Sequence, residues 1–301
     1  MKKAQTVKQM TLPEFERKFA TDEKCREYLM DRRWPEGVTC PRCVNPNVHE
    51  SKTKEGSWIC YKCNPKGYRF SLLVGTIFEN TNYPLTVWFK VMYLMLVSKK
   101  GMSALQIHRM IGSGSYRTAW YMCHRIRAGL NDPQFAKLTG FVEIDETFIG
   151  GKEKNKHHDK KHGGGRGSVG KIPVVGAVSR KKGTVVARVI DNVSAQTLNE
   201  FVLDTVSTRV SLVATDEWRG YDRLSEDGWP HKTVTHSRGQ YVNGNVHTNT
   251  IEGFWSLVKR GIIGNFHKVS AKYLPLYIKE FEFRYNNRKN PDIFGAAIAG
   301  C

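Results

Sequence analysis

The sequence predicts a multidomain α+β protein in which a small cysteine-bearing region and a group of helices precede a mixed α/β domain. Three observations predict this order. Two Cys-x-x-Cys pairs lie in a turn-rich segment without apolar periodicity, and helical periodicity then runs from Leu85 to Leu130. After Pro133 the pattern changes to alternating and short apolar runs, which are typical of strands. A chain of 301 residues has room for two or three domains.

The chain carries a large positive charge. Lysine and arginine number 47 against 28 aspartate and glutamate residues, which gives a net charge of +19. Such an excess favours a polyanionic partner, and nucleic acid is the leading candidate. No apolar run approaches the ~20 residues of a membrane-spanning helix, and the first residues lack the apolar core of a signal peptide. We therefore expect a cytoplasmic, nucleoid-associated protein without a membrane partner.

A helical N-terminal segment is expected over residues 1–35. Thr11 and Glu14 have the spacing of a capping box, with Pro13 in the first turn, so a helix should begin near residue 12. A second helix should lead to Trp34.

The four paired cysteines predict a zinc ribbon over residues 36–72. Sixteen residues separate the two pairs, within the spacing of structural zinc sites. Each pair supplies two thiolates from one turn, and the four complete a tetrahedron, so the Zn²⁺ should be structural. Because the segment has few core residues, metal binding should supply much of its folding free energy. The ligands are Cys40, Cys43, Cys60 and Cys63.

Residues 80–132 are expected to form a DNA-binding helix-turn-helix region. Helical patterns at 103–112 and 115–130 are joined by a Gly-Ser-Gly turn, so the second helix would enter the major groove with Arg117 near its start. Helical bundles without a DNA role share this pattern. The neighbouring zinc ribbon and the positive charge favour DNA binding.

The region 138–290 is expected to form the α/β domain. Its pattern predicts a mixed sheet with a crossover helix at 195–206. Residues 150–171 are rich in glycine and lysine without apolar periodicity, so we expect a mobile loop there and no nucleotide site. The expected strands are 140–145, 172–178, 184–190 and 211–216.

Three acidic residues of this region have the context of a catalytic metal site. Asp145 ends the first expected strand and Asp216 ends the last, so both carboxylates should lie at strand ends. Glu252 lies on a helix with one apolar stripe and shares an edge of that helix with Lys259. Mg²⁺ prefers oxygen ligands, and two such ions can activate the attacking oxygen and stabilise the leaving one in phosphodiester chemistry. Lys259 would bind a phosphate near the scissile bond.

Neighbouring polar residues remain alternatives or supports for this site. Glu146 and Glu217 directly follow the two aspartates, and Glu143 lies two residues before the first one, on the same strand face. Asn249 could replace the glutamate as the third ligand, although a neutral amide binds Mg²⁺ more weakly than a carboxylate.

The segment after the second aspartate has residues suited to DNA. Arg219 could hold a phosphate, while Trp218 and Tyr221 could either stack on a base or pack in the core. The basic residues expected to contact DNA are Arg117, Arg125, Arg219, Lys259 and Arg260.

Motifs in one order over nearly the whole chain resemble a known family, the bacterial insertion-sequence transposases with an N-terminal zinc ribbon, which are related to the eukaryotic Merlin elements. The motifs are CPRC, CYKC, FSLLVGTIFENT, SKKGMSALQIHRMIG, VEIDETFIGGK, TDEWRGY, HTNTIEGFWSLVKRGIIGNFHKVS and EFEFRYNNR.

This resemblance implies an RNase H-like catalytic domain over 138–290, of the DDE type, whose acidic triad maps onto Asp145, Asp216 and Glu252. It also implies cleavage at terminal inverted repeats, followed by attack of the freed 3′-hydroxyl on target DNA. The expected cofactors are two Mg²⁺ or Mn²⁺ ions at the triad and one structural Zn²⁺. Two DNA ends must be paired, so a homodimer or higher assembly on DNA is expected.

Two other functions remain open from the sequence. A zinc-ribbon and helix-turn-helix regulator would bind DNA without cutting it, but that reading leaves the three acids unexplained. An RNase H-type structure-specific nuclease would share the metal chemistry and would hydrolyse DNA without joining it.

Overall fold

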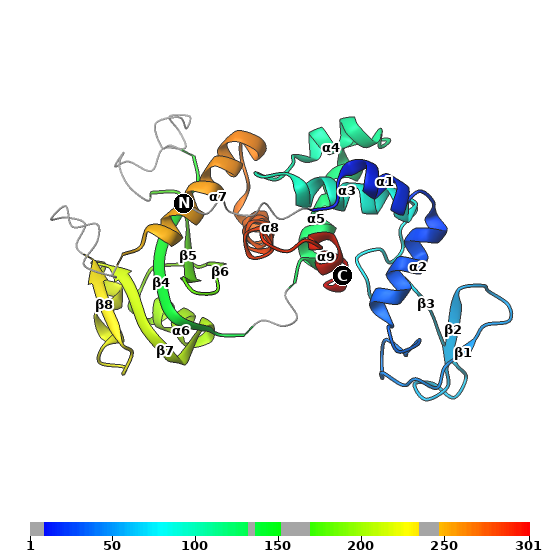
Figure 1. The fold of residues 1–301 in the computed structure, drawn as a ribbon, viewed down its shortest axis with the longest axis horizontal. Helices are drawn as coiled ribbons and strands as arrows, with labels where there is room; N and C mark the ends of the chain where they lie inside the picture. Colours follow the sequence, from blue (N-terminus) through cyan, green and yellow to red (C-terminus); the bar gives the residue numbers. More distant parts are fainter. Residues whose placement is uncertain (1–8, 132–135, 152–168, 235–246) are drawn as a thin grey trace. The chain divides into compact units, whose positions relative to one another are not determined.

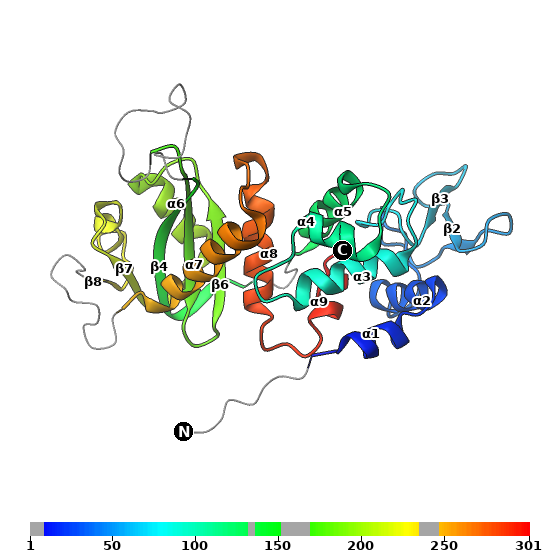
Figure 2. The same cartoon turned by 90° about the horizontal axis from the view of Figure 1, so that it is seen from above.

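The computed structural model describes residues 9–131, 136–151, 169–234 and 247–301 (Figures 1 and 2). Its contacts divide the chain into two compact units, residues 1–131 with 289–301, and residues 132–288. The end of the chain therefore belongs to the first unit, although the whole second unit separates the two segments in sequence.

The helices of the first unit begin where their capping residues predict. The Thr11 hydroxyl accepts from the backbone of Glu14, whose carboxylate accepts from the Thr11 backbone at 2.8 Å, so the expected capping box is present. Ser103 and Ser115 cap the two helices of the expected helix-turn-helix, and Gly112 ends the first of them at a φ of 64°. The helices are α1 (Leu12–Lys18), α2 (Asp22–Arg33), α3 (Leu85–Val97), α4 (Ala104–Ile111), α5 (Tyr116–Gly129) and α9 (Ile293–Ala299).

Aromatic packing joins the C-terminal helix α9 to the first unit. The ring of Phe294 lies 5.3 Å from that of Phe89 on α3 and 5.1 Å from that of Phe19, between ring centroids. All three rings are buried. Burial of large aromatic side chains is a strong apolar driving force, and it accounts for the return of the chain to this unit.

The cysteine-bearing segment forms a small antiparallel sheet of β1 (His49–Glu50), β2 (Ser57–Cys60) and β3 (Tyr68–Ser71). Its apolar contacts are few. Trp58 lies 5.3 Å from Trp34 and 6.0 Å from Phe70, between ring centroids. A core of this size gives little stability by itself, in agreement with the expected role of metal.

The second unit is built on a five-stranded mixed sheet of order β6-β5-β4-β7-β8. β4 and β6 are antiparallel to β5, whereas β7 is parallel to both β4 and β8. The expected crossover helix α6 (Ala195–Thr205) connects β6 to β7. The strands are β4 (Leu138–Ile149), β5 (Ile172–Ser179), β6 (Thr184–Val189), β7 (Val206–Asp216) and β8 (His231–Val234).

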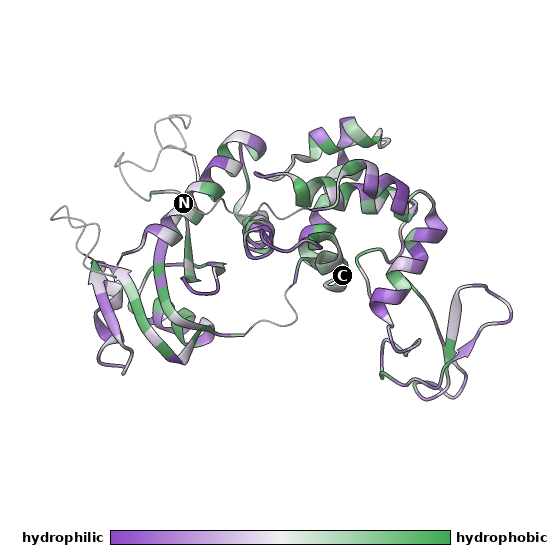
Figure 3. Cartoon of the chain, viewed as in Figure 1, coloured by the Kyte–Doolittle hydropathy of each residue, from purple (hydrophilic) through white to green (hydrophobic). Residues whose placement is uncertain are grey.

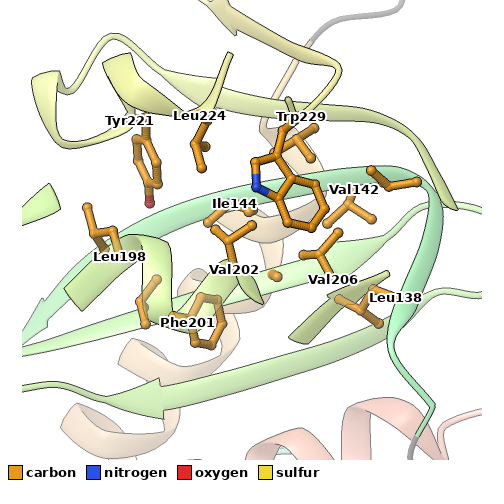
Figure 4. Close-up of a cluster of buried hydrophobic side chains, with 14 of the residues drawn as sticks. Leu138, Val142, Ile144, Leu198, Phe201, Val202, Val206, Tyr221, Leu224 and Trp229 are labelled. Carbon is orange, nitrogen blue, oxygen red and sulfur yellow. The ribbon is translucent and has the colours of Figure 1, made fainter. Parts of the chain in front are cut away.

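Helices cover both faces of this sheet. On one face, α6 and the 3₁₀ helix η3 (Arg219–Leu224) bury a cluster that includes Ile144, Val202 and Trp229 (Figure 4). On the other face, α7 (Asn249–Gly261) and α8 (Leu274–Asn286) pack on β5 and β6. Figure 3 shows that α7 carries both hydrophobic and hydrophilic residues. The π-helix η5 (Ile262–Phe266) and the 3₁₀ helix η6 (Ala271–Tyr273) connect α7 to α8.

The strand that carries Asp145 is longer than expected, and the prediction that Asp145 ends it was wrong. β4 continues to Ile149, which pairs with Ile172 of β5. The parallel partner β7 ends at Asp216. Asp145 therefore lies inside β4. The described pairing of β4 with β7 ends at Glu143, whereas its pairing with β5 continues to Ile149.

In the described parts of the chain, no helix is long and apolar enough to cross a bilayer. The expected mobile loop over 150–171 lies largely outside the described residues, which stop at 151 and resume at 169.

Candidate catalytic site

The four paired cysteines meet at one point of the first unit. Their sulfur atoms lie within 4.8 Å of one another, with 3.5 Å between Sγ of Cys40 and Cys63 and 3.7 Å between Sγ of Cys43 and Cys60. Four sulfurs bound tetrahedrally about 2.3 Å from one ion stand about 3.8 Å apart. The cysteines therefore fit one Zn²⁺ with all four positions filled by sulfur, which is the geometry of a structural site.

A second group of possible metal ligands lies in the α/β unit. Among the described residues, Asp145, Glu146 and Asp216 each offer a carboxylate oxygen within 4.8 Å of the other two. The strands position them, because Asp145 and Glu146 follow each other on β4 and Asp216 ends the adjacent β7. The separation suits oxygen ligands of one or two divalent cations. The structure thus brings together the two predicted aspartates and adds Glu146.

The carboxylates of this group disfavour one another's charge. Burial raises the pKa of Asp145 to about 7, and the charges of Asp216 and Glu252 add to the rise, while Lys259 opposes it. Burial also raises the pKa of Glu146 to about 8, with further contributions from Asp216 and Asp145. A bound cation would relieve this repulsion, and raised carboxylate pKa values in a cluster of this kind are typical of functional sites.

Tyr221 belongs to the core beneath this group. Its hydroxyl donates a hydrogen bond to Oε1 of Glu146, and its ring is fully buried in the cluster on the α6 side of the sheet (Figure 4). Of the two uses left open for this residue, packing therefore holds, and the hydroxyl orients a carboxylate beside the two aspartates.

The helix α7 presents Glu252 and Lys259 as its sequence predicts. Ile251, Phe254 and Val258 are fully buried against the sheet, whereas Glu252 and Lys259 are exposed. Both charges act on Asp145, since they shift its pKa in opposite directions. Oε1 of Glu252 accepts a hydrogen bond of 2.9 Å from the hydroxyl of Thr248. Asn249, the alternative third ligand, is exposed at the first residue of α7.

Glu143 binds the beginning of α7 from the sheet. Its carboxylate accepts hydrogen bonds from the backbone of Thr250 at 2.8 Å and of Ile251 at 3.0 Å, and from the Thr250 hydroxyl at 2.7 Å. Arg180 forms an ion pair with the same carboxylate at 2.5 Å and donates to the carbonyl oxygen of His247 at 2.7 Å. Glu143 thus lies on the strand face that the sequence predicted, and no local sequence pattern indicated its partners on α7 and at Arg180.

Comparison with known proteins agrees with this arrangement of a cysteine cluster followed by an acidic cluster. Residues 20–66 match the model of the transposase zinc-ribbon domain, and residues 137–286 match the model of the ISXO2-like transposase domain. A protein in transposable element ISH50 of Halobacterium salinarum is 30% identical over 286 residues, which cover 91% of this chain and 94% of that protein. The chain belongs to the ISXO2-like transposase family. The resemblance predicted from its motifs is confirmed.

Two further likenesses are partial. A transposase-like protein of Haemophilus influenzae is 34% identical over 99 residues, or 33% of this transposase and 78% of that protein. A chain of the simian T-cell lymphotropic virus intasome, solved by cryo-electron microscopy in complex with PP2A regulatory subunit B56 gamma, shares 14% identity. That likeness covers 58% of this chain and 67% of the other at a TM-score of 0.29.

Arg117 and Arg125 on α5 of the transposase have different surroundings. Arg117 is exposed on the first turn of α5, beside a surface hollow of about 330 Å³. Arg125 lines the same hollow, but it also donates to the carbonyl oxygens of Glu79 at 2.9 Å and Thr76 at 3.4 Å, and lies over the ring of Trp88. These contacts give Arg125 a structural task, which the sequence pattern did not indicate.

Trp218 and Arg219, which follow Asp216 closely, lie at the surface of the transposase. The backbone N–H of Trp218 donates to Oδ1 of Asp216 at 3.1 Å, and its indole N–H donates to the carbonyl oxygen of Val193 at 3.3 Å. Trp218 is 48% exposed. The hydrogen bonds hold the residue in place, and much of its surface stays accessible. Arg219 beside it is exposed, as is Arg260 on α7.

Proposed function

We propose that this transposase binds the terminal inverted repeats of a DNA insertion sequence and catalyses metal-dependent cleavage and strand transfer. The observation that carries the proposal is the acidic cluster of Asp145, Glu146 and Asp216, with Glu252 and Lys259 acting on it from α7. Family membership supports the reaction class, and the cluster supplies the group of oxygen ligands that such chemistry requires.

Asp145, Asp216 and Glu252 would hold two Mg²⁺ or Mn²⁺ ions, with Glu146 as a further carboxylate at the same place. When bound, the ions would activate the attacking oxygen and stabilise the leaving one. Water would attack phosphorus in line first and break its bond to the 3′-oxygen at the end of the element, which frees a 3′-hydroxyl. That hydroxyl would then attack a phosphorus of the target in line and displace a 3′-oxygen of the target strand, without a covalent protein intermediate. The strand order and directions of the second unit support an RNase H-like fold for this domain.

The remaining residues would bind and orient DNA. Lys259 lies on the same edge of α7 as Glu252 and would hold a phosphate next to the scissile bond. The zinc ribbon and the helix-turn-helix would bind the ends of the element, and Arg117 would lie near the bases. Arg219 and Arg260 would contact phosphates. Because two ends must be joined to one target, the active species would be a homodimer or larger assembly.

The test is a strand-transfer assay with purified protein, Mg²⁺, a labelled duplex that carries the repeat beside the gene, and a supercoiled plasmid. Wild type should produce labelled plasmid, and Asp145→Asn and Asp216→Asn should lose both cleavage and joining while binding the duplex normally. Asp204→Asn is the matched control, since Asp204 is an exposed aspartate paired with Arg188 outside the cluster.

The outcomes separate the rival functions. Cleavage without joined product would indicate a structure-specific nuclease. Tight binding without cleavage under Mg²⁺ and Mn²⁺ alike would indicate a regulator, and retained cleavage in either aspartate variant would exclude the proposed triad.

A further inference from the structure

The contact between Glu143 and α7 affects the proposed metal site. Glu143 accepts from the backbone N–H groups of Thr250 and Ile251, and Glu252 is the next residue. Asn249 is the first residue of α7, and the two N–H groups that Glu143 accepts belong to the second and third. Glu143 also lies two residues before Asp145, on the same face of β4. One carboxylate therefore connects the strand of the first aspartate to the helix turn that carries the glutamate.

The α7 N-terminus is completed from another element. Thr248 precedes α7, and in the described structure its side chain does not cap the helix but donates to Oε1 of Glu252. Glu143, which lies on β4, caps the helix instead. It is 107 residues away from Thr250 in sequence. The first N–H groups of a helix require acceptors, and the positive end of the helix dipole favours an anionic one.

The chemistry of Glu143 fits a fixed, charged anchor. Its carboxylate is fully buried, and a buried charge is tolerated only when it is paired and hydrogen-bonded. Arg180 supplies the counter-charge, and the ring nitrogen Nδ1 of His247 lies 3.2 Å from the same oxygen. Arg180 reaches the carboxylate from the connection between β5 and β6, and the backbone N–H groups of Thr250 and Ile251 reach it from the start of α7. The carboxylate therefore fixes the rotation of the helix about its axis and its position along that axis.

We infer that Glu143 is a positioning residue, which docks the N-terminus of α7 onto β4 and so sets Glu252 in place relative to Asp145. This inference rests on the proposed function, because it concerns the third ligand of the proposed metal site. A slip of α7 by one residue would rotate Glu252 by about 100° and shift it by about 1.5 Å. Mg²⁺ demands near-ideal octahedral geometry at about 2.0–2.1 Å, so even part of such a slip would remove a ligand.

The test measures Mn²⁺ binding to the zinc-loaded full-length protein, from the electron paramagnetic resonance signal of free Mn²⁺. Glu143→Gln keeps the size of the side chain and removes its charge. We expect Mn²⁺ affinity to fall about tenfold, the typical loss when a group that orients a metal ligand is changed. DNA affinity should stay unchanged, since Glu143 is buried.

Glu280→Gln is the matched control. Glu280 is also a fully buried glutamate with an arginine partner, Arg284 at 3.3 Å, but it lies on α8. This variant should bind Mn²⁺ within about twofold of wild type. If it lost as much affinity as Glu143→Gln, a general loss of stability would explain both results, and the inference would be overturned.

A double-mutant cycle with Glu252→Gln tests whether Glu143 acts through Glu252. In the Glu252→Gln background, Glu143→Gln should weaken Mn²⁺ binding by less than about twofold, because the ligand that it positions is already gone. An equal loss in both backgrounds, or wild-type affinity in Glu143→Gln, would refute the positioning role. If Glu143→Gln fails to fold, Glu143→Asp keeps the charge and withdraws the carboxylate from the backbone N–H groups of Thr250 and Ile251. Wild-type Mn²⁺ affinity in Glu143→Asp would also refute the positioning role.

Asp145→Asn separates this inference from the proposed function. If Asp145→Asn leaves Mn²⁺ binding intact, the proposed metal site itself fails. If Asp145→Asn weakens binding and Glu143→Gln does not, the metal site stands and only the positioning role is lost.

Discussion

Asp145 lies opposite Gly176 in the antiparallel register of β4 and β5. A Cβ at Gly176 would stand 2.7 Å from Cζ2 and 2.8 Å from Cη2 of Trp255, on α7. The missing side chain therefore lets α7 lie directly on the sheet beside the aspartate. Apolar contact through Gly176 and the polar contact through Glu143 hold the same helix at two points.

Gly176→Ala should displace α7 and impair the acidic site. Trp255 is buried and cannot move away freely, so the added methyl group should cost about 1–3 kcal/mol of unfolding free energy and lower the rate of Mg²⁺-dependent cleavage. Thermal unfolding and cleavage of a labelled duplex measure the two effects.

Gly253→Ala, on the exposed side of the same helix, is the control for stability. A Cβ there meets nothing within 4 Å, and alanine favours a helix interior over glycine by about 1 kcal/mol. It should unfold at the wild-type temperature or higher. Wild-type stability and cleavage in Gly176→Ala would contradict the close-packing argument.

The acidic cluster should make the protein less stable at alkaline pH when Zn²⁺ is bound but Mg²⁺ is absent. The pKa values of Asp145 and Glu146 are raised to about 7 and about 8 in the folded state, so the unfolded state releases these protons at lower pH. Protonation of these two carboxyl groups contributes to the free energy of unfolding. This contribution is fully present below about pH 4, where both groups are protonated even in the unfolded chain, and it is lost as the pH rises through 7 and 8. We expect a lower unfolding temperature at pH 8.5 than at pH 6, without added Mg²⁺.

Two comparisons isolate this effect. Asp145→Asn should raise the unfolding temperature at pH 8.5 and change it little at pH 4.5, and Mg²⁺ should stabilise wild type more at pH 8.5 than at pH 6. No chelator is used, because it would remove Zn²⁺. Burial lowers the pKa of His231, so its protonation destabilises the fold below about pH 6.5. This effect opposes the difference expected between pH 6 and pH 8.5, and it is the same in wild type and Asp145→Asn. Equal Mg²⁺ stabilisation at both pH values would contradict the raised pKa values.

Loss of one zinc ligand should unfold the ribbon. Cys60→Ser removes a buried thiolate that also accepts from the Asn45 amide at 3.9 Å. The small core of β1–β3 cannot replace the metal, so bound zinc should fall from one to near zero and proteolysis within residues 40–71 should accelerate. Zinc content by elemental analysis is the measurement. Cys301→Ser is the control, because a serine hydroxyl can still donate to the Ala297 carbonyl as Cys301 does at 3.0 Å.

Arg117 and Arg125 on α5 should separate DNA binding from stability. Arg117→Ala removes an exposed charge, so DNA affinity should fall and the salt slope of binding should decrease by about 1 if the contact is to a phosphate, with unfolding unchanged. Arg125→Ala removes the donor to Glu79 and Thr76, so it should lower the unfolding temperature. Filter binding over a salt series and thermal unfolding measure these effects, and the reverse pattern would contradict the assignment.

The indole of Trp218 should bind a nucleobase next to the scissile phosphate. Trp218 is exposed beside Asp216, and it is held by one hydrogen bond from its backbone N–H and one from its indole N–H. Stacking on one base contributes about 1–3 kcal/mol. Trp218→Ala should slow cleavage at subsaturating DNA, and Trp218→Phe should restore part of the rate. Leu203→Ala, at another exposed apolar residue, should have no effect. Equal rates for wild type and Trp218→Ala would exclude stacking.

Local patterns were enough to predict most elements of this transposase. Capping residues and apolar periodicity gave the starts of α1, α4 and α5 and the stripe of α7, because both depend on neighbours within one or two turns. The spacing of two Cys-x-x-Cys pairs sufficed for the cysteine cluster, since each pair comes from a single turn. The order of Asp145, Asp216 and Glu252 indicated the acidic site through the motifs around them.

Only the tertiary structure decided how these parts meet. Glu146 joins the aspartates, Tyr221 supports it, and Asp145 lies inside a strand because β5 continues beyond the described pairing with β7. Tyr221 lies 75 residues after Glu146, Thr250 lies 107 residues after Glu143, and Glu79 lies 46 residues before Arg125. No local pattern encodes which distant donor reaches a buried carboxylate or carbonyl oxygen, because that pairing depends on how the strands align and how the helices pack.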